Sequence, residues 1–381
     1  MKIGILGAGQ LGMMLGRAGE RLGMTFRYLD PATEISARDR GEHLCAAYED
    51  VEALEEFVRD LDVITYEFEN VPVMSARWLA ERVPVHPVPE ALRVAQDRLF
   101  EKSFFTELGI PSPDFADFFF RDEYEEALRH IGMPAVLKTR RFGYDGKGQR
   151  LVRDEEEADR AFEELHGLPL FLEGFVPFER EVSIIACRAK DGACVFYPLV
   201  ENHHREGILR LSIAPAAGVT PDLQALAEKH ARAVLEKLDY VGVLAIEFFE
   251  KDGMLYVNEM APRVHNSGHW SIEGAVTSQF EQHVRAVLGW PLGSTRLRAP
   301  TVSANVLGTV DAPRPARLGN VDAVLAAPGA ALHWYGKHEA RPLRKMGHVT
   351  LVGDAGEGDG VDDTETLLSR ARETRDSLTF H

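Results

Sequence analysis

Short apolar runs alternate with amphipathic stretches along the first hundred residues of the chain. The runs KIGIL, TFRYLD and DVITY are long enough for buried strands, and the stretches between them place apolar residues at helical spacing. This alternation is typical of βαβ units, in which the strands form a parallel sheet. The predicted elements are strands at 2–6, 25–30 and 62–66, helices at 10–22, 51–60 and 73–82, and a short strand near VPVHP.

The pattern changes after Gly109, where a predicted helix over AQDRLFEKSFFTELG ends before the proline-bounded IPSP. Residues 112–180 contain a strand AVLKT, a glycine-rich loop, an acidic helix at 154–165 and a strand within LPLFLEGFV, which predicts a compact α+β unit. Two hairpins, EVSIIACRA to CVFYPLVEN and GVLAIEFF to MLYVNEM, indicate a second, antiparallel sheet. The remaining predicted elements are helices at 221–238, 276–288 and 363–377, strands at 301–308, 331–337 and 347–353, and an exposed loop GDAGEGDG.

Length and composition are compatible with a globular enzyme. The chain has 381 residues, which predicts two or three domains. Its 60 acidic residues outnumber the 43 basic ones, which argues against a nonspecific nucleic-acid surface because such a surface needs a basic field. We find neither an apolar run of about 20 residues nor a signal-peptide pattern, so we expect a cytoplasmic protein without a membrane partner. Cys45, Cys187 and Cys194 show no metal-type spacing and are assigned no chemistry.

GILGAGQLG, residues 4–12, runs from the first strand into a glycine-rich turn. The spacing of Gly7, Gly9 and Gly12 fits the dinucleotide-binding fingerprint, and Asp30 closes the next apolar run where an acid would bind a ribose. A nicotinamide-dependent dehydrogenase is therefore one hypothesis. The parallel series is short for a six-stranded dinucleotide domain, however, and the helix that follows the turn favours any anion at its N-terminus.

Lys138 interrupts the apolar strand AVLKT, where burial of an ammonium group is costly unless an anion meets it. Five residues later, GYDGKGQ (residues 143–149) offers three glycines whose backbone N–H groups can close over phosphate oxygens, and Lys147 adds a charge. Taken alone, such a loop is more often a flexible hairpin. Beside Lys138, it favours a phosphate site.

Glu247 and Glu259 lie on strands joined by the turn KDG. A two-residue Asp-Gly loop would place the two glutamates on opposite faces of the hairpin. A three-residue loop, which pairs Glu250 with Met254, would place them on one face, and we predict this arrangement. Carboxylates on one face repel each other unless a cation lies between them, and oxygen ligands beside a phosphate loop suit Mg²⁺. The alternative is a solvated face with unrelated acids, which we disfavour because we expect four apolar neighbours on the same face: Ala245, Phe249, Leu255 and Val257.

APRVHNSGHW, residues 261–270, follows this hairpin and concentrates polar side chains. A lone histidine here would more often be structural, but Arg263, His265 and Asn266 together indicate an anion site. A basic cluster occurs farther on in YGKHEARPLRKMGH. Its charge fits a solvated edge and a phosphate clamp equally well. The cluster consists of Lys337, Arg341, Arg344 and Lys345.

These motifs together resemble a known family. The lysine strand, GYDGKGQ, the strand end EGFV and the paired glutamates are similar to the ATP-grasp superfamily, whose two α+β subdomains hold ATP between them. RRFGYDGKGQ, FYPLVENHHREGILRLSIAPA, NEMAPRVHNSGHW and HWYGK with RPLRKMGH resemble the N5-carboxyaminoimidazole ribonucleotide synthases of purine biosynthesis over nearly the whole chain. The fold class that this implies combines α/β and α+β parts. Its expected domains are a Rossmann-like pre-ATP-grasp domain at 1–103, a lid subdomain at 104–180, a metal-binding subdomain at 181–295 and a small C-terminal β module at 296–381.

The resemblance also implies a reaction. ATP cleavage would drive carboxylation of the exocyclic amine of 5-aminoimidazole ribonucleotide by bicarbonate, through a carboxyphosphate intermediate. Whether released CO2 or carboxyphosphate itself meets the amine stays open. Mg²⁺ on Glu247 and Glu259, together with Lys138, would stabilise the transferring phosphoryl group. The expected cofactors are ATP and Mg²⁺, the partners are small molecules only, and the expected assembly is a homodimer.

The resemblance assigns roles residue by residue. Those expected to line the nucleotide site are Arg98, Lys138, Gly143, Tyr144, Asp145, Gly146, Lys147, Gly148, Gln149, Glu173, Gly174, Phe175, Val176, Glu181, His204, Asn258 and Glu259. Those expected to act in catalysis are Arg263, His265, Asn266 and Lys337, of which the first three are expected to hold bicarbonate or carboxyphosphate. Those expected to bind the ribonucleotide are Tyr144, Asp145, Arg263, Lys337 and Arg344, with either Glu67 or Glu69 and with backbone N–H groups near Gln10 and Leu11 for the 5′-phosphate.

Three alternatives complete the sequence analysis. A dehydrogenase leaves Lys138, the second glycine loop and the glutamate pair without a role. A related ATP-grasp ligase that uses formate or an amino acid would differ mainly in the loop PRVHNSGHW. A non-enzymatic scaffold would hydrolyse no ATP with any pair of substrates.

Overall fold

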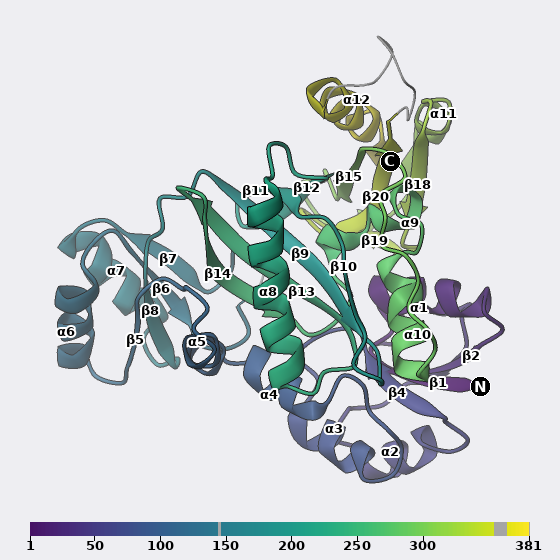
Figure 1. The fold of residues 1–381 in the computed structure, drawn as a ribbon, viewed down its shortest axis with the longest axis horizontal. Helices are drawn as coiled ribbons and strands as arrows, with labels where there is room; N and C mark the ends of the chain where they lie inside the picture. Colours follow the sequence, from purple (N-terminus) through teal and green to yellow (C-terminus); the bar gives the residue numbers. More distant parts are fainter. Residues whose placement is uncertain (144–145, 354–363, 381) are drawn as a thin grey trace.

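The N-terminal part of the chain folds around a small parallel sheet. The computed structural model describes residues 1–143, 146–353 and 364–380. The strand order is β3-β2-β1-β4 with all neighbours parallel, as the alternating pattern predicts (Figure 1). The strand expected near VPVHP is reduced to a single bridge between Val85 and Ile64. The elements are β1 (Lys2–Leu6), α1 (Gln10–Glu20), β2 (Thr25–Leu29), β3 (Glu42–Leu44), α2 (Val51–Phe57), β4 (Val63–Tyr66), α3 (Val73–Ala80) and α4 (Pro89–Ala95).

A separate four-stranded antiparallel sheet forms the next unit, with the order β5-β8-β6-β7. Its core includes Phe118, Tyr124, Leu137 and Leu172, which pack between the sheet and two helices. The predicted elements include β6, α7 and β8 but not β5, α6 or β7. Strands β5 and β7 have only four residues each, of which one is fully buried, and α6 carries many exposed charged residues. The elements are α5 (Arg98–Glu107), β5 (Phe115–Phe118), α6 (Arg121–Ile131), β6 (Ala135–Thr139), β7 (Gln149–Val152), α7 (Glu155–Leu165) and β8 (Leu170–Gly174).

The centre of the molecule is a nine-stranded sheet with the order β14-β13-β9-β11-β12-β15-β20-β18, to which β10 adds at β9. The strand expected over CVFYPLVEN is interrupted at Pro198, since proline cannot donate to a ladder, and becomes β10 and β11. Helix α8 covers one face, and α10 covers the other (Figure 1). The elements are β9 (Arg180–Arg188), β10 (Cys194–Phe196), β11 (Val200–Arg205), β12 (Ile208–Ala214), α8 (Pro221–Lys237), β13 (Gly242–Lys251), β14 (Met254–Ala261), η1 (Asn266–Gly268), α9 (Ser271–Gly274) and α10 (Gln279–Leu288).

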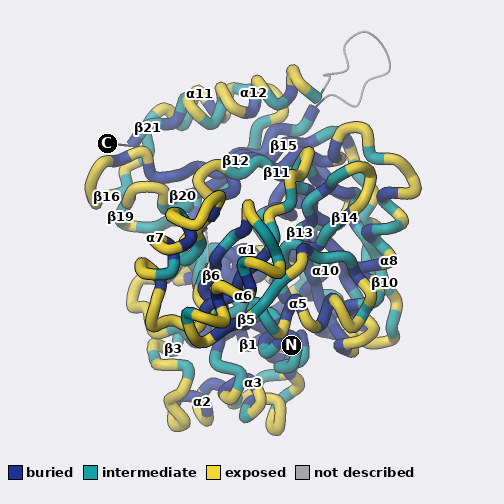
Figure 2. The backbone as a smooth tube through the Cα atoms, turned by 90° about the vertical axis from the view of Figure 1, so that its left-hand side faces the viewer, coloured by how far each residue is buried: buried dark blue, intermediate teal, exposed yellow. Residues whose placement is uncertain are grey.

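Burial on both faces explains why β13 reads as an almost continuous apolar run. Val243 and Ala245 face a core shared with α1 and α10, whereas Leu244 and Ile246 face a core shared with α8. Figure 2 shows the resulting buried interior beneath exposed loops and helix surfaces. The rigid, two-sided sheet therefore fixes the positions of the side chains at its edge.

The C-terminal strands continue this central sheet. β12 pairs with β15 antiparallel, with Ser212 opposite Ser303, and β15 pairs with β20. Residues 354–360 of the loop GDAGEGDG lie outside the described residues, and no described helix is long and apolar enough to cross a membrane. The elements are β15 (Thr301–Leu307), β16 (Arg314–Pro315), β17 (Leu318–Gly319), α11 (Val321–Leu325), β18 (Ala330–Trp334), β19 (Glu339–Ala340), β20 (Lys345–Val352), α12 (Thr364–Asp376) and β21 (Thr379–Phe380).

Candidate active site

Two adjoining cavities lie where the three sheets meet. The first, of about 630 Å³, lies between the β5–β8 sheet and the central sheet, and the second, of about 390 Å³, extends from it toward α1 and the end of β4. Both are bounded by the same five side chains, so a group transferred between the cavities would pass them. These are Arg98, Glu259, His265, Asn266 and Lys345.

Most residues predicted for a nucleotide site line the first cavity. Gly143 lines the second cavity instead, Gly148 lines neither, and Tyr144 and Asp145 lie outside the described residues. The remaining predicted residues are brought together as the resemblance implies. They are Arg98, Lys138, Gly146, Lys147, Gln149, Glu173, Gly174, Phe175, Val176, Glu181, His204, Asn258 and Glu259.

Lys138 has the anionic partner that its burial requires. Its ammonium group contacts the carboxylate of Glu173 on the neighbouring strand β8, and Lys102 on α5 lies 2.5 Å from the other oxygen of that carboxylate. Burial alone would raise the pKa of Glu173, but the two ammonium groups hold it at about 2. Burial lowers the pKa of Lys138 despite this partner. The group of three charges keeps a net positive charge at the floor of the cavity.

The glycine-rich loop closes against the hairpin of β11 and β12. Gly146 has a φ of +75°, and a Cβ built on it would lie 2.9 Å from the carbonyl oxygen of Glu206. Gly148 has a φ of +70°, and a Cβ there would lie 2.6 Å from Thr139 Oγ1. Both positions therefore require glycine for conformation and for space.

The two glutamates predicted to bind a metal share a face, but the predicted turn is wrong. Lys251 pairs with Met254, so the loop has two residues, Asp252 and Gly253, with φ values of 51° and 71°. A bulge between Glu247 and Phe248 shifts the register by one residue and sets Glu247 opposite Glu259.

The same register corrects the neighbours expected beside the glutamates. Leu255 and Val257 pair with Glu250 and Phe248, on the opposite face from Glu247, and pack in the core beneath α8. Phe249 lines the first cavity on the glutamates' face. The prediction that the two glutamates share a face is thus confirmed. The prediction that four apolar residues share that face is wrong for Leu255 and Val257.

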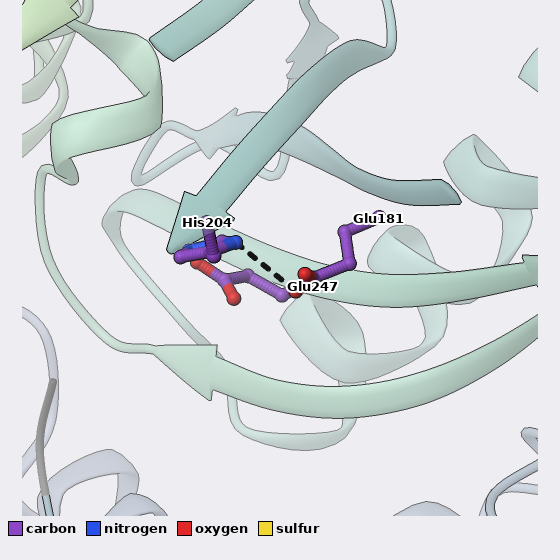
Figure 3. Close-up of side chains that lie close together, drawn as sticks. All are labelled: Glu181, His204 and Glu247. Carbon is purple, nitrogen blue, oxygen red and sulfur yellow. Dashed lines mark ion pairs between the residues drawn. The ribbon is translucent and has the colours of Figure 1, made fainter. Parts of the chain in front are cut away.

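Acidic groups crowd around Glu247. Burial, together with the nearby carboxylates of Glu259 and Glu181, raises the pKa of Glu247 to about 7, although His204 opposes this. Glu181, His204 and Glu247 each offer a ligand atom, and these atoms lie within 4.8 Å of one another (Figure 3). His204 Nδ1 lies 3.1 Å from the carboxylate of Glu181. Burial lowers the pKa of His204, but the hydrogen bond to Glu181 and the charges of nearby carboxylates raise it to about 9. Carboxylate oxygens in this arrangement fit a hard divalent cation such as Mg²⁺.

The loop after β14 brings His265 and Asn266 to the wall between the cavities and Arg263 to the second cavity. Arg263 donates a hydrogen bond from Nε to Glu69. Of Glu67 and Glu69, it is therefore Glu69 that contacts this loop. His265 Nε2 lies 3.6 Å from Glu247, and burial with the charges of Arg263 and Lys345 holds the pKa of His265 well below its usual value. The Oδ1 atom of Asn266 is buried and has no hydrogen-bond partner among the residues that the structure describes. An unpaired buried acceptor at this wall indicates that a ligand donor belongs there.

The N-terminal glycine turn surrounds a protein carboxylate. Glu67 accepts hydrogen bonds from the N–H groups of Gly9 and Gly12, the latter at 2.5 Å. A Cβ on Gly7 would lie 2.5 Å from Glu67 Cγ, and one on Gly9 would lie 2.6 Å from Glu67 Oε1. Asp30 accepts from Ala8 N at 2.8 Å. The spacing typical of a dinucleotide site is therefore explained by the close packing of Glu67.

The basic residues near the C-terminus divide between different surroundings. Lys337 and Arg344 line a smaller cavity of about 220 Å³ beside Gln10, whereas Arg341 pairs with Glu339 and is largely exposed. Lys345 instead reaches the wall between the two main cavities. The predicted ribonucleotide residues that line the second cavity are Gln10, Leu11, Glu67, Glu69 and Arg263.

Two lysines of this site are missing from the predicted residues. Lys345 belongs to the basic cluster already noted, but spacing could not separate it from Lys337 and Arg344. Lys102 lies on the buried side of α5 and donates to Val257 O at 2.9 Å. A fully buried lysine on an amphipathic helix looks like a surface residue in the sequence, so only the three-dimensional structure reveals it.

Two α+β units that enclose a cavity, with a buried lysine, a glycine loop and paired acidic side chains in its walls, define an ATP-grasp protein. A family model described as the ATP-grasp domain matches residues 103–280. The ribonucleotide synthetase preATP-grasp domain matches residues 1–96, and the phosphoribosylaminoimidazole carboxylase C-terminal domain matches residues 301–358.

Whole-chain relatives narrow this class. An N5-carboxyaminoimidazole ribonucleotide synthase from Pseudomonas aeruginosa is 52% identical over 351 residues, which cover 92% of this chain and 94% of the relative. The crystal structure of N5-carboxyaminoimidazole ribonucleotide synthetase from Thermus thermophilus is 51% identical, with a TM-score of 0.88 over 98% of this chain and 97% of that chain. The Aspergillus clavatus enzyme in complex with ADP and 5-aminoimidazole ribonucleotide is 30% identical, with a TM-score of 0.87 over 98% of each chain. The chain belongs to the N5-carboxyaminoimidazole ribonucleotide synthase family, which confirms the resemblance in its motifs and removes the dehydrogenase alternative.

Proposed function

We propose that the protein carboxylates the exocyclic amine of 5-aminoimidazole ribonucleotide, using ATP and bicarbonate and releasing ADP and phosphate. The observation that carries this proposal is the shared wall of the two cavities. A nucleotide in the first cavity and a ribonucleotide in the second would meet at Glu259, His265 and Asn266. An intermediate made from ATP could therefore react without entering bulk water.

Activation of bicarbonate is the chemical task of the first cavity. A bicarbonate oxygen attacks the γ-phosphorus of ATP, the bond to the β–γ bridging oxygen breaks, and carboxyphosphate and ADP result. Lys138 and Arg98 would stabilise the negative charge on the transferred group. Glu247 and Glu259 would hold Mg²⁺, which supplies charge neutralisation on the phosphate oxygens when bound.

Carboxylation is the task of the shared wall. Arg263, His265 and Asn266 are proposed to hold bicarbonate and then carboxyphosphate, with Asn266 Oδ1 accepting the bicarbonate hydroxyl. Lys337 is proposed to act in catalysis from the smaller cavity beside Gln10. The amine nitrogen forms the new C–N bond, inorganic phosphate leaves, and the amine loses one proton. The low pKa of His265 keeps its imidazole neutral, and because Nδ1 accepts from Ser267 N, Nε2 carries a proton that it can donate to a ligand oxygen.

The residues proposed for the ribonucleotide surround the second cavity and the smaller cavity beside Gln10, which is the third. Arg263 with Gln10 and Leu11 would bind it from the second cavity, and Lys337 with Arg344 from the third. Because Glu67 already accepts the N–H groups of Gly9 and Gly12, a 5′-phosphate would use other donors near Gln10. Tyr144 and Asp145 are proposed from the resemblance alone. The homodimer, the use of bicarbonate and the cytoplasmic location likewise belong to this proposal.

The decisive experiment measures phosphate release from MgATP and ¹⁴C-bicarbonate, with and without aminoimidazole ribonucleotide. We expect the ribonucleotide to stimulate phosphate release and the label to appear in the product, counted at once in alkaline solution. Stimulation by formate or an amino acid, without label from bicarbonate, would instead assign the protein to a related ligase. Folded protein that hydrolyses no ATP with any substrate pair would overturn the proposal.

A further inference from the structure

A further cavity, of about 920 Å³, lies on the other side of the β11–β12 hairpin from the nucleotide cavity. Its walls come from this hairpin, from the start of β9, and from α12 and β21 at the end of the chain, where α12 lies above β12 and β15 (Figure 1). No step proposed above uses it. Its volume falls in the range of small-molecule sites.

Five arginines line this cavity, and four of them come from two elements. Arg205 and Arg210 come from the hairpin, and Arg372 and Arg375 come from α12. In a chain of net charge −17, a group of arginines around one cavity differs from the average surface.

Five carboxylates also line the cavity, and three of them pair with arginines of its walls. Arg210 lies 3.3 Å from Glu206, and Arg375 lies 2.7 Å from Asp376. Within the described parts of the chain, Arg205 and Arg372 have no carboxylate at ion-pair distance. Arg180, at the far wall, is already paired with Glu201 and Glu250.

Arg210 shows the consequence of this crowding. Its Nε atom is buried and has no hydrogen-bond partner within residues 1–143, 146–353 and 364–380. Burial, followed by the charges of Arg205 and Arg375, lowers the pKa of Arg210 despite the opposing effect of Glu206. A buried guanidinium N–H without an acceptor is costly, and an anion in the cavity would supply the acceptor.

We propose that this cavity binds a phosphate-bearing small molecule, held by the guanidinium groups of Arg205, Arg210, Arg372 and Arg375. Guanidinium groups present paired N–H donors that match phosphate oxygens, and arginine is the usual residue for such sites. The same walls contain Phe178 and Phe380, which offer apolar surface to the rest of a phosphorylated ligand.

The position of the cavity gives such a ligand access to the nucleotide site. Phe178, Glu181, His204 and Glu206 line both cavities, and the glycine loop approaches the carbonyl of Glu206. A ligand that fixes the hairpin therefore changes the affinity for ATP, and ATP changes the affinity for the ligand by the same factor.

Equilibrium dialysis of ³²P-labelled inorganic phosphate tests this site on the full-length protein. A non-hydrolysable ATP analogue with Mg²⁺ is kept saturating, so that the nucleotide cavity is filled. We expect saturable binding of one phosphate at this cavity, weakened roughly tenfold or more in the double variant Arg205→Gln, Arg372→Gln. The matched control is Arg232→Gln with Arg370→Gln, which loses the same charge at residues that do not line the cavity and should bind phosphate as the wild type does.

Two results would overturn the proposal. One is the absence of saturable binding to the wild type, and the other is equal affinity in the double variant and the wild type. Unchanged affinity of the double variant for the ATP analogue shows that it is folded. The test does not depend on carboxylation, so a failure of the proposed reaction and a failure of this site are distinguishable. A second arm measures the KM for ATP, which phosphate should shift in the wild type but not in the double variant.

Discussion

His283 joins the N-terminal domain to the central sheet, and its replacement gives a defined pH-dependent change in stability. The imidazole is buried, accepts a hydrogen bond from Val243 N on β13 at 3.0 Å, and lies 2.7 Å from Thr65 Oγ1 on β4. Because Nδ1 accepts, the proton resides on Nε2 and is donated to the threonine. Protonation of Nδ1 would break the bond to Val243 and place a charge in the core.

The magnitude follows from the shift in pKa. Burial lowers the pKa of His283 from 6.5 to about 3 in the folded protein. The unfolded chain takes up a proton as the pH falls below 6.5, whereas the folded protein takes it up only near pH 3, so stability is lost on acidification. Between pH 7 and pH 5 the loss assigned to this one group is about 2 kcal/mol.

The assay compares equilibrium urea unfolding of the wild type and His283→Gln at both pH values. Glutamine can accept from Val243 and donate to Thr65 but does not titrate, so the variant should lose about 2 kcal/mol less than the wild type on acidification. His130→Gln, on the exposed side of α6, is the control and should behave as the wild type. Equal pH dependence in the wild type and His283→Gln would refute the reasoning.

Four further outcomes are expected at the active site. His265→Ala should lower the rate of coupled carboxylation about 100-fold while changing the KM for ATP less than threefold, and equal losses in both would contradict its role. Lys345→Met should lower kcat by a similar factor in the labelled-bicarbonate assay, because its charge lies between the cavities; an unchanged kcat would exclude this. Glu247→Gln should raise the Mg²⁺ concentration for half-maximal activity roughly tenfold or more, and an unaltered Mg²⁺ titration would remove it from the metal site. NAD⁺ should cause no saturable fluorescence quenching at micromolar concentration, since Glu67 fills the glycine turn, and quenching would reopen the dinucleotide hypothesis.

The hairpin of β13 and β14 shows what sequence spacing can and cannot predict. The pattern correctly placed Glu247 and Glu259 on one face, yet it did so through a three-residue turn that the protein does not have. The actual Asp-Gly turn needs a bulge near Glu247 to restore the register. A bulge depends on packing against both neighbouring strands, so local sequence carries little signal for it.

The glycine turn shows the reverse limitation. Its spacing is typical of nucleotide sites, and the sequence could not reveal that a side chain 55 residues beyond Gly12 occupies the turn. Glu67 was considered only as a contact of the ribonucleotide. Long-range packing of this kind is decided by the fold, whereas Lys138 was predictable because a charge inside an apolar strand violates a local rule.

Long elements with a clear apolar pattern are predictable from the sequence. Two four-residue strands and one highly charged helix are not. α8 and β13 were expected within a few residues of their observed bounds, whereas β5, α6 and β7 were missed. The family motifs indicate more of the residues that line the cavities than the spacing of charged residues and glycines does. The domain boundaries and the individual site roles stay predictions.

The pairing of β12 with β15 makes the end of this protein inseparable from its middle. A chain cut at residue 295 would leave β12, seven residues long, as an open strand edge, and it would also lose the lysine at the start of β20. Open edges of this length template aggregation. The C-terminal segment is therefore not an independent domain that can be exchanged between relatives. Fragments that omit it are poor starting points for crystallisation or for building chimeric proteins.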